Sequence, residues 1–391
     1  IEEQYRNKGL NKDDVDLVAF RQECRKFAEG WVDIQRDEFK RLGVQGKWDD
    51  PYLTMNFNAE AVIAEEFMKF LMNGSLYQGS KPVMWSPVEK TALAEAEVEY
   101  HDHTSHTVWV RFKPQIDFPP FAPHSVNDEN RNAIDELDVL MKSSVVIWTT
   151  TPWTIPQNRA VAFSPTIEYA VFRIKSVAEH SAAVPDETVV LARKLAAETF
   201  KAARVEEYDE LFQVRDFEGM RLFHPFRGVA ETNGEWDYDV PMLPGDHVTD
   251  EAGTGFVHTA PSHGDDDYQL GLKHGLEMTY NVEPDGSYRA SLPLFGGQHI
   301  IQPDGKEGPA NVSVIKQLAY AGALFAKGKV KHSYPHSWRS KAPVIYRNTP
   351  QWFAAIDVPV GGDDTHGKTI RERALTEIDN VKWTPQSGRN R

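Results

Sequence analysis

The stretch 144–158 constrains the fold most, because its two halves favour opposite backbone conformations. It reads S-V-V-I-W-T-T-T-P-W-T-I-P-Q-N. The first half is rich in β-branched and aromatic residues, which favour a buried strand, whereas the two prolines of the second half end any regular strand. Successive strand side chains point to opposite faces, so Thr149 and Thr151 would face one way and Thr150 the other. The stretch therefore predicts a buried strand whose end presents threonine hydroxyls to a cleft.

A second stretch, 253–267, repeats this pattern. It reads G-T-G-F-V-H-T-A-P-S-H-G-D-D-D and runs a short apolar strand into a turn rich in Pro and Gly. A helix over 265–274 can begin there, with its acidic first turn favoured by the helix dipole. Three threonines before a proline are ordinary strand residues when they occur alone. Two such polar junctions in one chain favour a shared pocket.

Together, W-T-T-T-P-W-T-I-P-Q-N and G-T-G-F-V-H-T-A-P-S-H-G-D-D-D-Y resemble the two halves of the editing pocket of the isoleucyl-tRNA synthetase family, class I aminoacyl-tRNA synthetases of bacterial type. In that family the editing domain is inserted in the catalytic domain and hydrolyses Val-tRNA(Ile), which is tRNA(Ile) mischarged with valine. The valyl and leucyl families typically carry T-T-R-P at the first site, so Pro152-Trp153 favours the isoleucyl family. The resemblance implies a fragment that contains the editing domain, an aminoacyl-tRNA deacylase.

The resemblance also implies roles for seven residues of this chain. Three catalytic hydroxyls would hydrogen-bond the ester, the ribose and the attacking water: those of Thr149, Thr150 and Thr151. Four further residues would bind the substrate: Trp153, Asn158, His258 and Asp267. Among these, His258 would limit the size of the amino acid admitted, and Asp267 would bind its ammonium group.

Other chemistry can be assembled from the second stretch. A metal-dependent hydrolase could hold a divalent ion with His258, His263 and two of the carboxylates Asp265–Asp267. A Ser-His-Asp set could be drawn from Ser262, His263 and Asp265, although three residues crowded into one turn do not readily align as nucleophile, base and orienting group. A third class is a tRNA-binding module without catalysis, for which the acidic composition is poor support.

The composition indicates the class of protein, its partners and its location. The 391 residues are 40% hydrophobic and 26% charged, which is ordinary for a globular protein, and a formal charge of −15 excludes a general basic coat for nucleic acid. We expect tRNA(Ile) charged with valine to meet this chain mainly through its 3′ terminal adenosine. No apolar run reaches membrane-spanning length and no signal peptide is evident, so we expect a cytoplasmic monomer that binds no membrane. A single cysteine, Cys24, excludes a disulfide within the chain.

The signatures of the family's synthetic site, H-I-G-H and K-M-S-K-S, occur nowhere in the chain. The resemblance therefore implies an excised fragment of a parent enzyme, isoleucine-tRNA ligase, whose ATP-using synthetic site lies elsewhere. It implies no cofactor for the fragment itself.

The expected fold class is α/β. Many short strands with few helices predict a β-barrel-like editing domain of mixed strands with flanking helices, over 98–330. Helical flanks resembling the catalytic domain would cover 1–80, with the return toward that domain over 351–391. Between them, 81–97 and 331–350 would form a linker module.

The linker module resembles a zinc ribbon that has lost its cysteines. Many relatives carry C-x-x-C twice, and the matching positions here hold no thiol: Ser86, Glu89, Ser337 and Ser340. Serine hydroxyls are poor zinc ligands, so we expect no structural metal. Three nearby histidines are interpreted as a solvated hairpin turn between two strands of 93–110 rather than as a metal site: His101, His103 and His106.

Periodicity predicts the remaining elements. A helix over 12–42 has a possible break at Gly30, and Asn58 is a candidate cap for a helix over 60–72. The segment 115–138 is expected to be an exposed loop that closes as a short helix at 132–141. Further strands are expected at 160–163, 169–174 and 188–191, and further helices at 193–203 and 311–327.

Overall fold

The computed structural model describes residues 1–115, 131–214, 216–359 and 367–390. The chain divides into two compact units. One consists of Ile1–Gln78 together with Trp352–Arg391, and the other of Gly79–Gln351. Most of the exposed loop expected over 115–138 lies outside the described residues.

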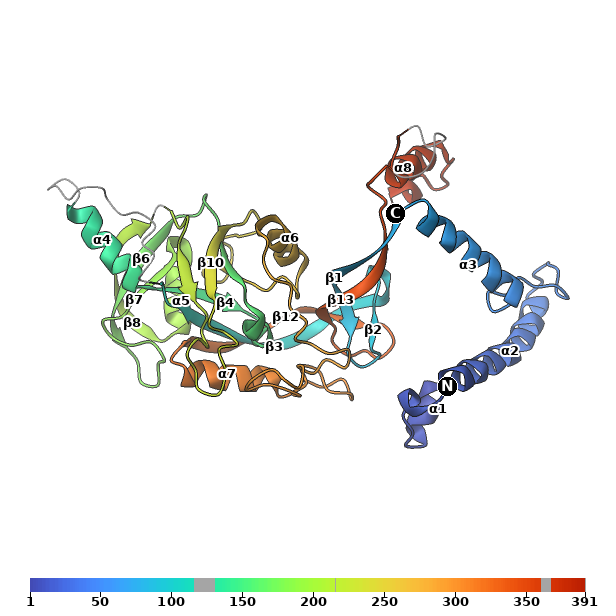
Figure 1. Ribbon diagram of the computed structural model, residues 1–391, viewed down its shortest axis with the longest axis horizontal. Helices are drawn as coiled ribbons and strands as arrows, with labels where there is room; N and C mark the ends of the chain where they lie inside the picture. Colours follow the sequence, from blue (N-terminus) through green and yellow to red (C-terminus); the bar gives the residue numbers. More distant parts are fainter. Residues whose placement is uncertain (116–130, 215, 360–366, 391) are drawn as a thin grey trace. The chain divides into compact units, whose positions relative to one another are not determined.

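The first unit is built from helices (Figure 1). They are α1 (Glu2–Asn7), α2 (Leu17–Arg41), α3 (Phe57–Met72) and α8 (Ile370–Asn380). The break expected at Gly30 is wrong, because α2 is continuous there and its 25 residues outweigh the cost of one glycine. The cap of α3 is Asn56 rather than Asn58. The helix α2 ends where expected, since Gly43 follows it with φ of +79°, which glycine adopts without strain.

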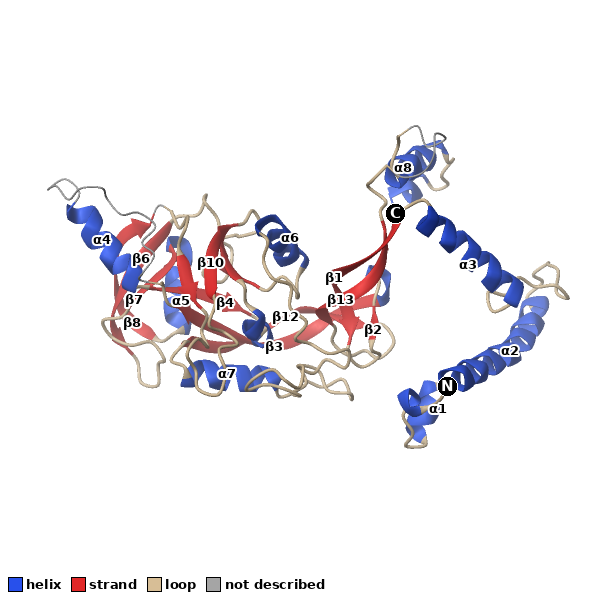
Figure 2. Ribbon diagram, viewed as in Figure 1, coloured by secondary structure: helices blue, strands red, loops and turns tan. Residues whose placement is uncertain are grey.

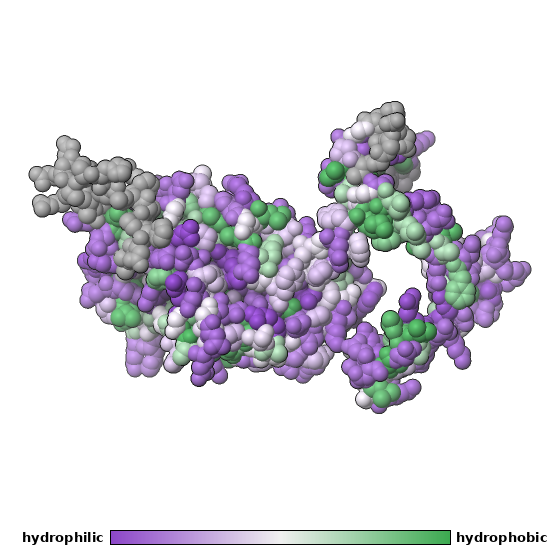
Figure 3. All heavy atoms as spheres, viewed as in Figure 1, coloured by the Kyte–Doolittle hydropathy of each residue, from purple (hydrophilic) through white to green (hydrophobic). Residues whose placement is uncertain are grey.

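Neither α2 nor α3 buries a residue among the described part of the chain. Large apolar side chains stay at the surface of both helices, including those of Phe27, Trp31, Phe67 and Leu71. Figure 3 shows apolar atoms at the surface of this unit. The amphipathic periodicity of these helices is therefore not matched by a core within the described residues. Nowhere in the described ranges does a helix combine the length and apolar character that crossing a bilayer requires.

The second unit carries the sheets (Figure 2). A six-stranded sheet has the order β12-β3-β4-β7-β6-β8, a four-stranded sheet the order β11-β5-β10-β9, and a three-stranded sheet the order β13-β1-β2. The strands of the large sheet are β3 (Val98–Phe112), β4 (Ser144–Thr149), β6 (Tyr169–Val177), β7 (Thr188–Ala192), β8 (Val205–Val214) and β12 (Leu324–Ser337). The others are β1 (Leu76–Ser86), β2 (Thr91–Ala92), β5 (Ala160–Phe163), β9 (Arg221–Phe223), β10 (Asp239–Pro244), β11 (Phe256–Thr259) and β13 (Ile345–Ala354). The helices are α4 (Arg131–Lys142), α5 (Ala196–Ala202), α6 (Asp265–His274) and α7 (Ala310–Tyr320).

The α/β fold class is confirmed. The barrel-like arrangement takes the form of open mixed sheets, because the described strands form no closed ring. Both parallel and antiparallel neighbours occur: β4 pairs antiparallel with β3 and parallel with β7. Among the described residues, the main hydrophobic core combines side chains of both larger sheets, including Val110, Ile147, Val161 and Phe256.

The strand β4 lies inside the large sheet, as its sequence predicts. Its first four residues are buried, and Ile147 is opposite Val110 of β3. The next residues form a short 3₁₀ helix, Pro152–Gln157, in which every residue is buried. The alternation of strand and proline turn therefore places Thr149 to Thr151 between two buried elements.

Two local predictions are wrong. The pair of strands expected over 93–110 is a single strand, β3, so His101, His103 and His106 lie within a strand paired to β12 and not in a hairpin turn. Polar residues are tolerated there because this half of β3 is largely exposed. The helix expected over 311–327 ends at Tyr320, since Leu324 to Lys327 pair with β3 at the start of β12.

Candidate functional site

The ends of β4 and β11 lie side by side, as the two polar junctions predict. Thr154 of the 3₁₀ helix and His258 of β11 are joined by a hydrogen bond of 2.8 Å between Thr154 Oγ1 and His258 Nε2. Asn158 reaches the same ring, with 2.7 Å between its Nδ2 and His258 Nδ1. Both stretches singled out in the sequence therefore meet at one histidine.

The hydrogen bonds determine the tautomer of His258. Asn158 Nδ2 donates to the carbonyl of Ala160 at 2.8 Å, so the amide turns its N–H groups toward the ring and His258 Nδ1 accepts. His258 Nε2 then carries the proton and donates to Thr154 Oγ1, whose own hydroxyl donates to the carbonyl of Thr151 at 2.8 Å. Every polar atom of the imidazole has a partner.

His258 is uncharged at neutral pH. Its side chain is buried, with 7% of the residue exposed. This burial, together with the neighbouring His263, lowers the pKa of His258 to about 3. A neutral ring with both nitrogens bonded has no free lone pair with which to take a proton from water. The ring is therefore suited to form a wall rather than to act as a base.

The three threonines differ in their hydrogen bonds. Thr149 Oγ1 lies 3.1 Å from Thr151 Oγ1 and accepts from Thr151 N at 3.1 Å. The two hydroxyls therefore lie together, but β4 ends at Thr149, so the local turn and not strand alternation places Thr151. Thr151 Oγ1 also lies 3.3 Å from Thr154 Oγ1, which links the threonines to His258.

The hydroxyl of Thr150 has no hydrogen bond among the described residues. Thr150 and Thr151 line a small cavity of about 40 Å³, together with Trp153 and with His103 and Tyr334 of the ribbon β3–β12. The Thr150 hydroxyl is thus the member of the triplet with free hydrogen-bonding capacity.

Trp153 is held from several sides. Its backbone N–H donates to Asn311 Oδ1 of α7 at 3.1 Å, and its carbonyl accepts from the Tyr288 hydroxyl at 2.6 Å. Its ring meets that of His263 edge-on, with 4.9 Å between centroids. These contacts fix the 3₁₀ helix, and with it the positions of Thr154 and Asn158.

Asp267 lies in the first turn of α6 and is half-buried. Its Oδ2 accepts from the backbone N–H of Ala260, which follows β11, at 2.8 Å. Burial raises the pKa of Asp267 to about 6; the Ala260 hydrogen bond opposes that rise and the charge of Asp266 adds to it. The other carboxylate oxygen has no hydrogen bond within the described residues. It is therefore free to accept one from a cationic ligand.

Hydrogen bonds join four of the seven residues into one network through Thr154: Thr149, Thr151, Asn158 and His258. Thr150 and Trp153 meet this network at the small cavity that they share with Thr151, whereas Asp267 bonds Ala260 and, among the described residues, is not hydrogen-bonded to the other six. Two residues that sequence reasoning missed hold parts of the site: Thr154, which links the threonines to His258, and Asn311, which binds the backbone of Trp153. Thr154 could have been found, because it lies three residues after Thr151 in a segment expected to turn. Asn311 carried no signal, because it lies 158 residues from its partner.

Comparison with known proteins supplies the family. The model of class I tRNA synthetases for isoleucine, leucine, methionine and valine matches residues 1–391. The chain belongs to this family. It is 55% identical to the isoleucine-tRNA ligase of Ruegeria pomeroyi and 50% identical to that of Caulobacter vibrioides, in each case over 100% of this chain and 39% of the relative. The resemblance to isoleucyl-tRNA synthetase is thereby confirmed, and the chain spans about two fifths of the length of these relatives.

One solved structure that matches is titled as the editing domain of the P. knowlesi cytosolic leucyl-tRNA synthetase. The match covers 44% of the present chain and 64% of the solved one, with a TM-score of 0.31 and 11% sequence identity.

In this member of the class I synthetases, the alternative active sites are not assembled. Ser262 accepts from Thr279 N at 2.9 Å and donates to its carbonyl at 2.8 Å, while His263 Nδ1 lies 2.9 Å from the Tyr346 carbonyl. Ser262 and His263 thus point to separate partners. For the metal alternative, Asp265 pairs with Lys81 at 3.3 Å, and within the described ranges no three His, Cys, Asp or Glu side chains gather as a ligand set. The alternative of a metal-dependent hydrolase is therefore not supported, because its proposed ligands do not converge among the described residues.

The four positions at which the family resemblance implies zinc-binding cysteines do converge. Glu89 Oε1 accepts from the Ser337 hydroxyl at 2.6 Å and from Ser340 N at 3.0 Å, while Glu89 N donates to Ser86 Oγ at 3.2 Å. Burial alone would raise the pKa of Glu89, but the hydrogen bonds from the two serines outweigh it and hold the pKa below its ordinary value. A carboxylate therefore ties together the two turns.

We predict that this tie does not need zinc. The purified protein should contain less than stoichiometric zinc, and a chelator should leave its melting temperature unchanged. Glu89→Ala should lower the free energy of unfolding by about 1–3 kcal/mol, because it removes two hydrogen bonds to a charged acceptor. Since the folded pKa of Glu89 lies below its unfolded value, this stabilisation should be present above the unfolded pKa and be lost as the pH falls through the folded pKa. Stoichiometric zinc, or unfolding on chelation, would contradict the prediction.

Proposed function

We propose that residues 98–330, within the unit Gly79–Gln351, are an editing domain that hydrolyses Val-tRNA(Ile), releasing valine from the 3′ terminal adenosine of a mischarged tRNA(Ile). The observation that carries the proposal is the meeting of the two stretches at His258, with threonine hydroxyls on one side of the network and a half-buried carboxylate at the start of α6. Identity of 55% to an isoleucine-tRNA ligase supports it.

The reaction needs a placed water, donors for the developing oxyanion and a hold on the ammonium group. The free hydroxyl of Thr150 is proposed to contact the ester or the water. The bonded pair Thr149 and Thr151 keeps that hydroxyl in position. Asp267 is proposed to bind the ammonium group through its free oxygen, by a charge-assisted hydrogen bond.

Such a site complements a synthetic site in a parent ligase that uses ATP. Valine lacks one methylene of isoleucine, and a hydrophobic pocket discriminates weakly against a ligand that is merely smaller. A second pocket that excludes isoleucine can hydrolyse the valine ester that results when the synthetic pocket accepts valine. His258, rigid and fully hydrogen-bonded, is proposed as the wall that excludes isoleucine.

Deacylation of Val-tRNA(Ile) by Thr150 variants tests the proposal. Thr150→Val keeps the shape of the side chain and removes its hydroxyl, so the rate should fall by roughly 10²-fold, the scale of losing one oxyanion donor. Thr150→Ser keeps the hydroxyl and should retain most of the rate. Because the proposed reaction uses no metal ion, a chelator should leave the deacylation rate unchanged.

Several results would contradict this function. The parent chain could leave Val-tRNA(Ile) intact, or Thr150→Val could match the parent. Loss of activity with chelator would instead support metal-assisted hydrolysis.

A further inference from the structure

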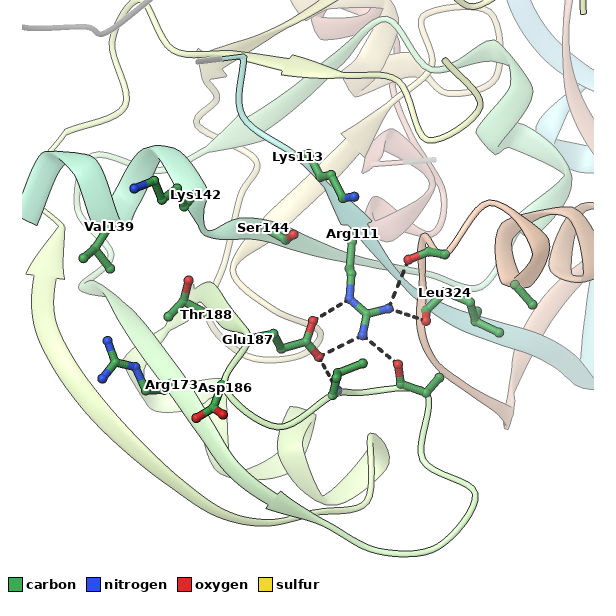
Figure 4. Close-up of a pocket in the computed structure, with 14 residues that line it drawn as sticks. Arg111, Lys113, Val139, Lys142, Ser144, Arg173, Asp186, Glu187, Thr188 and Leu324 are labelled. Carbon is green, nitrogen blue, oxygen red and sulfur yellow. Dashed lines mark hydrogen bonds and ion pairs between the residues drawn. The ribbon is translucent and has the colours of Figure 1, made fainter. Parts of the chain in front are cut away.

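A second cavity, of about 710 Å³, lies in the large sheet region among β3, α4, β6 and β7 (Figure 4). Its volume falls within the range of about 300–1,000 Å³ that is typical of small-molecule sites. None of its lining residues is among the seven of the candidate editing site. What it binds is therefore independent of the deacylase proposal.

The charge of this cavity is opposite to that of the whole chain. The chain has 43 basic and 58 acidic residues, a formal charge of −15. The cavity lining has four basic side chains, Arg111, Lys113, Lys142 and Arg173, against two acidic ones, Asp186 and Glu187. A concave region of positive charge concentrates anions, and on an acidic protein such a region is a specific local feature.

Arg111 and Glu187 neutralise each other and hold the wall of the cavity. Arg111 is 6% exposed, and its guanidinium donates to Glu187 Oε2 at 3.0 Å and to Oε1 at 2.9 Å. Its remaining N–H groups donate to backbone carbonyls of Leu324 at 2.5 Å and Ala182 at 2.7 Å. Figure 4 shows these bonds on one side of the cavity. Because Arg111 and Glu187 neutralise each other, the charges left in the lining are those of Lys113, Lys142 and Arg173 against that of Asp186.

Three other cations surround the cavity from different elements. Lys113 follows β3, Arg173 comes from β6 and Lys142 ends α4; all three are exposed. Lys142 binds Asp138 at 2.6 Å in an exposed pair, an interaction typically worth less than about 1 kcal/mol. Lys113 and Arg173 have no ion pair among the described residues.

The spacing of these cations indicates the form of the anion. Figure 4 draws Lys113, Lys142 and Arg173 apart, around the cavity, and not gathered at one point. The hydroxyls of Ser144 and Thr188 lie in the lining between them. A single small anion would meet one cation, whereas a ligand with several phosphate groups would meet more than one, each through charge-assisted hydrogen bonds.

We propose that this cavity binds a ligand carrying more than one phosphate group, with Lys113 and Arg173 as its main contacts. The shared chemistry is the phosphate oxygen. It can be supplied by the backbone of a nucleic acid or by a free polyphosphorylated small molecule, and the two sources are separated by experiment.

The test compares the parent chain with Lys113→Gln/Arg173→Gln and with a matched control, Lys194→Gln/Lys201→Gln. The control removes the same two positive charges from exposed positions outside the cavity lining. Two probes are used: inorganic tripolyphosphate by calorimetry, and uncharged tRNA(Ile) by filter binding across a salt series. All three proteins should melt at the same temperature within about 2 °C, because exposed substitutions change stability little.

The cavity variant should bind at least one probe tenfold more weakly or worse, while the control stays within twofold of the parent. Loss of tripolyphosphate binding alone identifies a free phosphorylated ligand. A weaker salt dependence for tRNA, by about one unit of the log–log slope for each phosphate that the variant no longer neutralises, identifies a nucleic-acid backbone. If neither probe binds the parent at millimolar concentration, or if the cavity variant and the control behave alike with both probes, the proposal is wrong.

Discussion

Asp267→Asn is expected to reduce hydrolysis of Val-tRNA(Ile) by at least about 10²-fold without loss of the fold. Asparagine retains an oxygen that can accept from Ala260 N, which the parent holds at 2.8 Å, but it lacks the charge proposed to bind the ammonium group. Asp266→Asn is the matched control, because Asp266 is the adjacent exposed carboxylate of the same turn. Its deacylation rate should stay near that of the parent.

The same variant should be at least as stable as the parent at pH 7. The folded pKa of Asp267, about 6, lies above its ordinary value of 3.8, so the folded state binds this proton more tightly than the unfolded state does. The stabilisation from protonated Asp267 is therefore present below pH 3.8 and is lost as the pH rises to about 6. Urea unfolding at pH 4 and pH 7 should show this loss in the parent and not in Asp267→Asn.

The raised pKa also predicts the pH dependence of deacylation. Only ionised Asp267 can pair with the ammonium group, so kcat/KM should fall on the acid side with an apparent pKa near 6. His258 and His263 do not account for this limb, because their pKa values are lowered by burial to about 3 and about 4. If Asp267 only holds the backbone of Ala260, Asp267→Asn will keep both the rate and the acid limb of the parent.

His258→Ala is expected to begin hydrolysing correctly charged Ile-tRNA(Ile), which the parent leaves intact, while retaining hydrolysis of Val-tRNA(Ile). The physical reason is steric: a rigid wall rejects the larger side chain by overlap, and truncation removes the wall. Deacylation rates for the two charged tRNAs measure the change in selectivity. If His258 were the general base, the variant would lose activity on Val-tRNA(Ile) and gain none on Ile-tRNA(Ile).

The His258 test needs a control for stability. Truncation removes the hydrogen bonds to Thr154 and Asn158, which keep their bonds to the Thr151 and Ala160 carbonyls. The free energy of unfolding should therefore fall by about 1–3 kcal/mol, since each hydrogen bond lost costs about 0.5–1.5 kcal/mol. His258→Gln supplies an amide with both a donor and an acceptor, so it should be the more stable variant. If His258 is a steric wall, the gain of activity on Ile-tRNA(Ile) should increase with the side-chain volume removed. It should therefore be larger in His258→Ala than in His258→Gln.

Local sequence patterns predicted the elements that bring residues to the site. The strand β5 lies at 160–163 and the helix α6 at 265–274, both as expected, and β4 ends at Thr149 before the first proline. Such patterns succeed where one face is buried and a turn residue marks the end. They failed at β3 and at the end of α7, because pairing between β3 and β12 set those boundaries and the two strands are far apart in the sequence.

The second motif shows how a local signal can depend on distant packing. Gly255 has φ of +80°, and a Cβ there would lie 2.4 Å from Ala192 Cβ and 3.2 Å from the ring of Tyr169. The glycine is required both by its backbone conformation and by this close approach. The sequence shows only that a glycine precedes the strand, whereas the reason for it lies in β6 and β7.

By itself, the sequence determined the residue types at the site, most of the local elements around them and the family resemblance. The tertiary structure decided what each group can do. It joined Thr149 and Thr151 by a hydrogen bond and, within the part of the chain that the structure describes, gave the Thr150 hydroxyl no such bond. It also made His258 a neutral ring with both nitrogens bonded, and it raised the pKa of Asp267. These properties depend on burial and on partners such as Asn158 and His258, which are 100 residues apart. Propensity and periodicity act over a few residues, so only the packed fold could set the charges and free hydrogen bonds of the site.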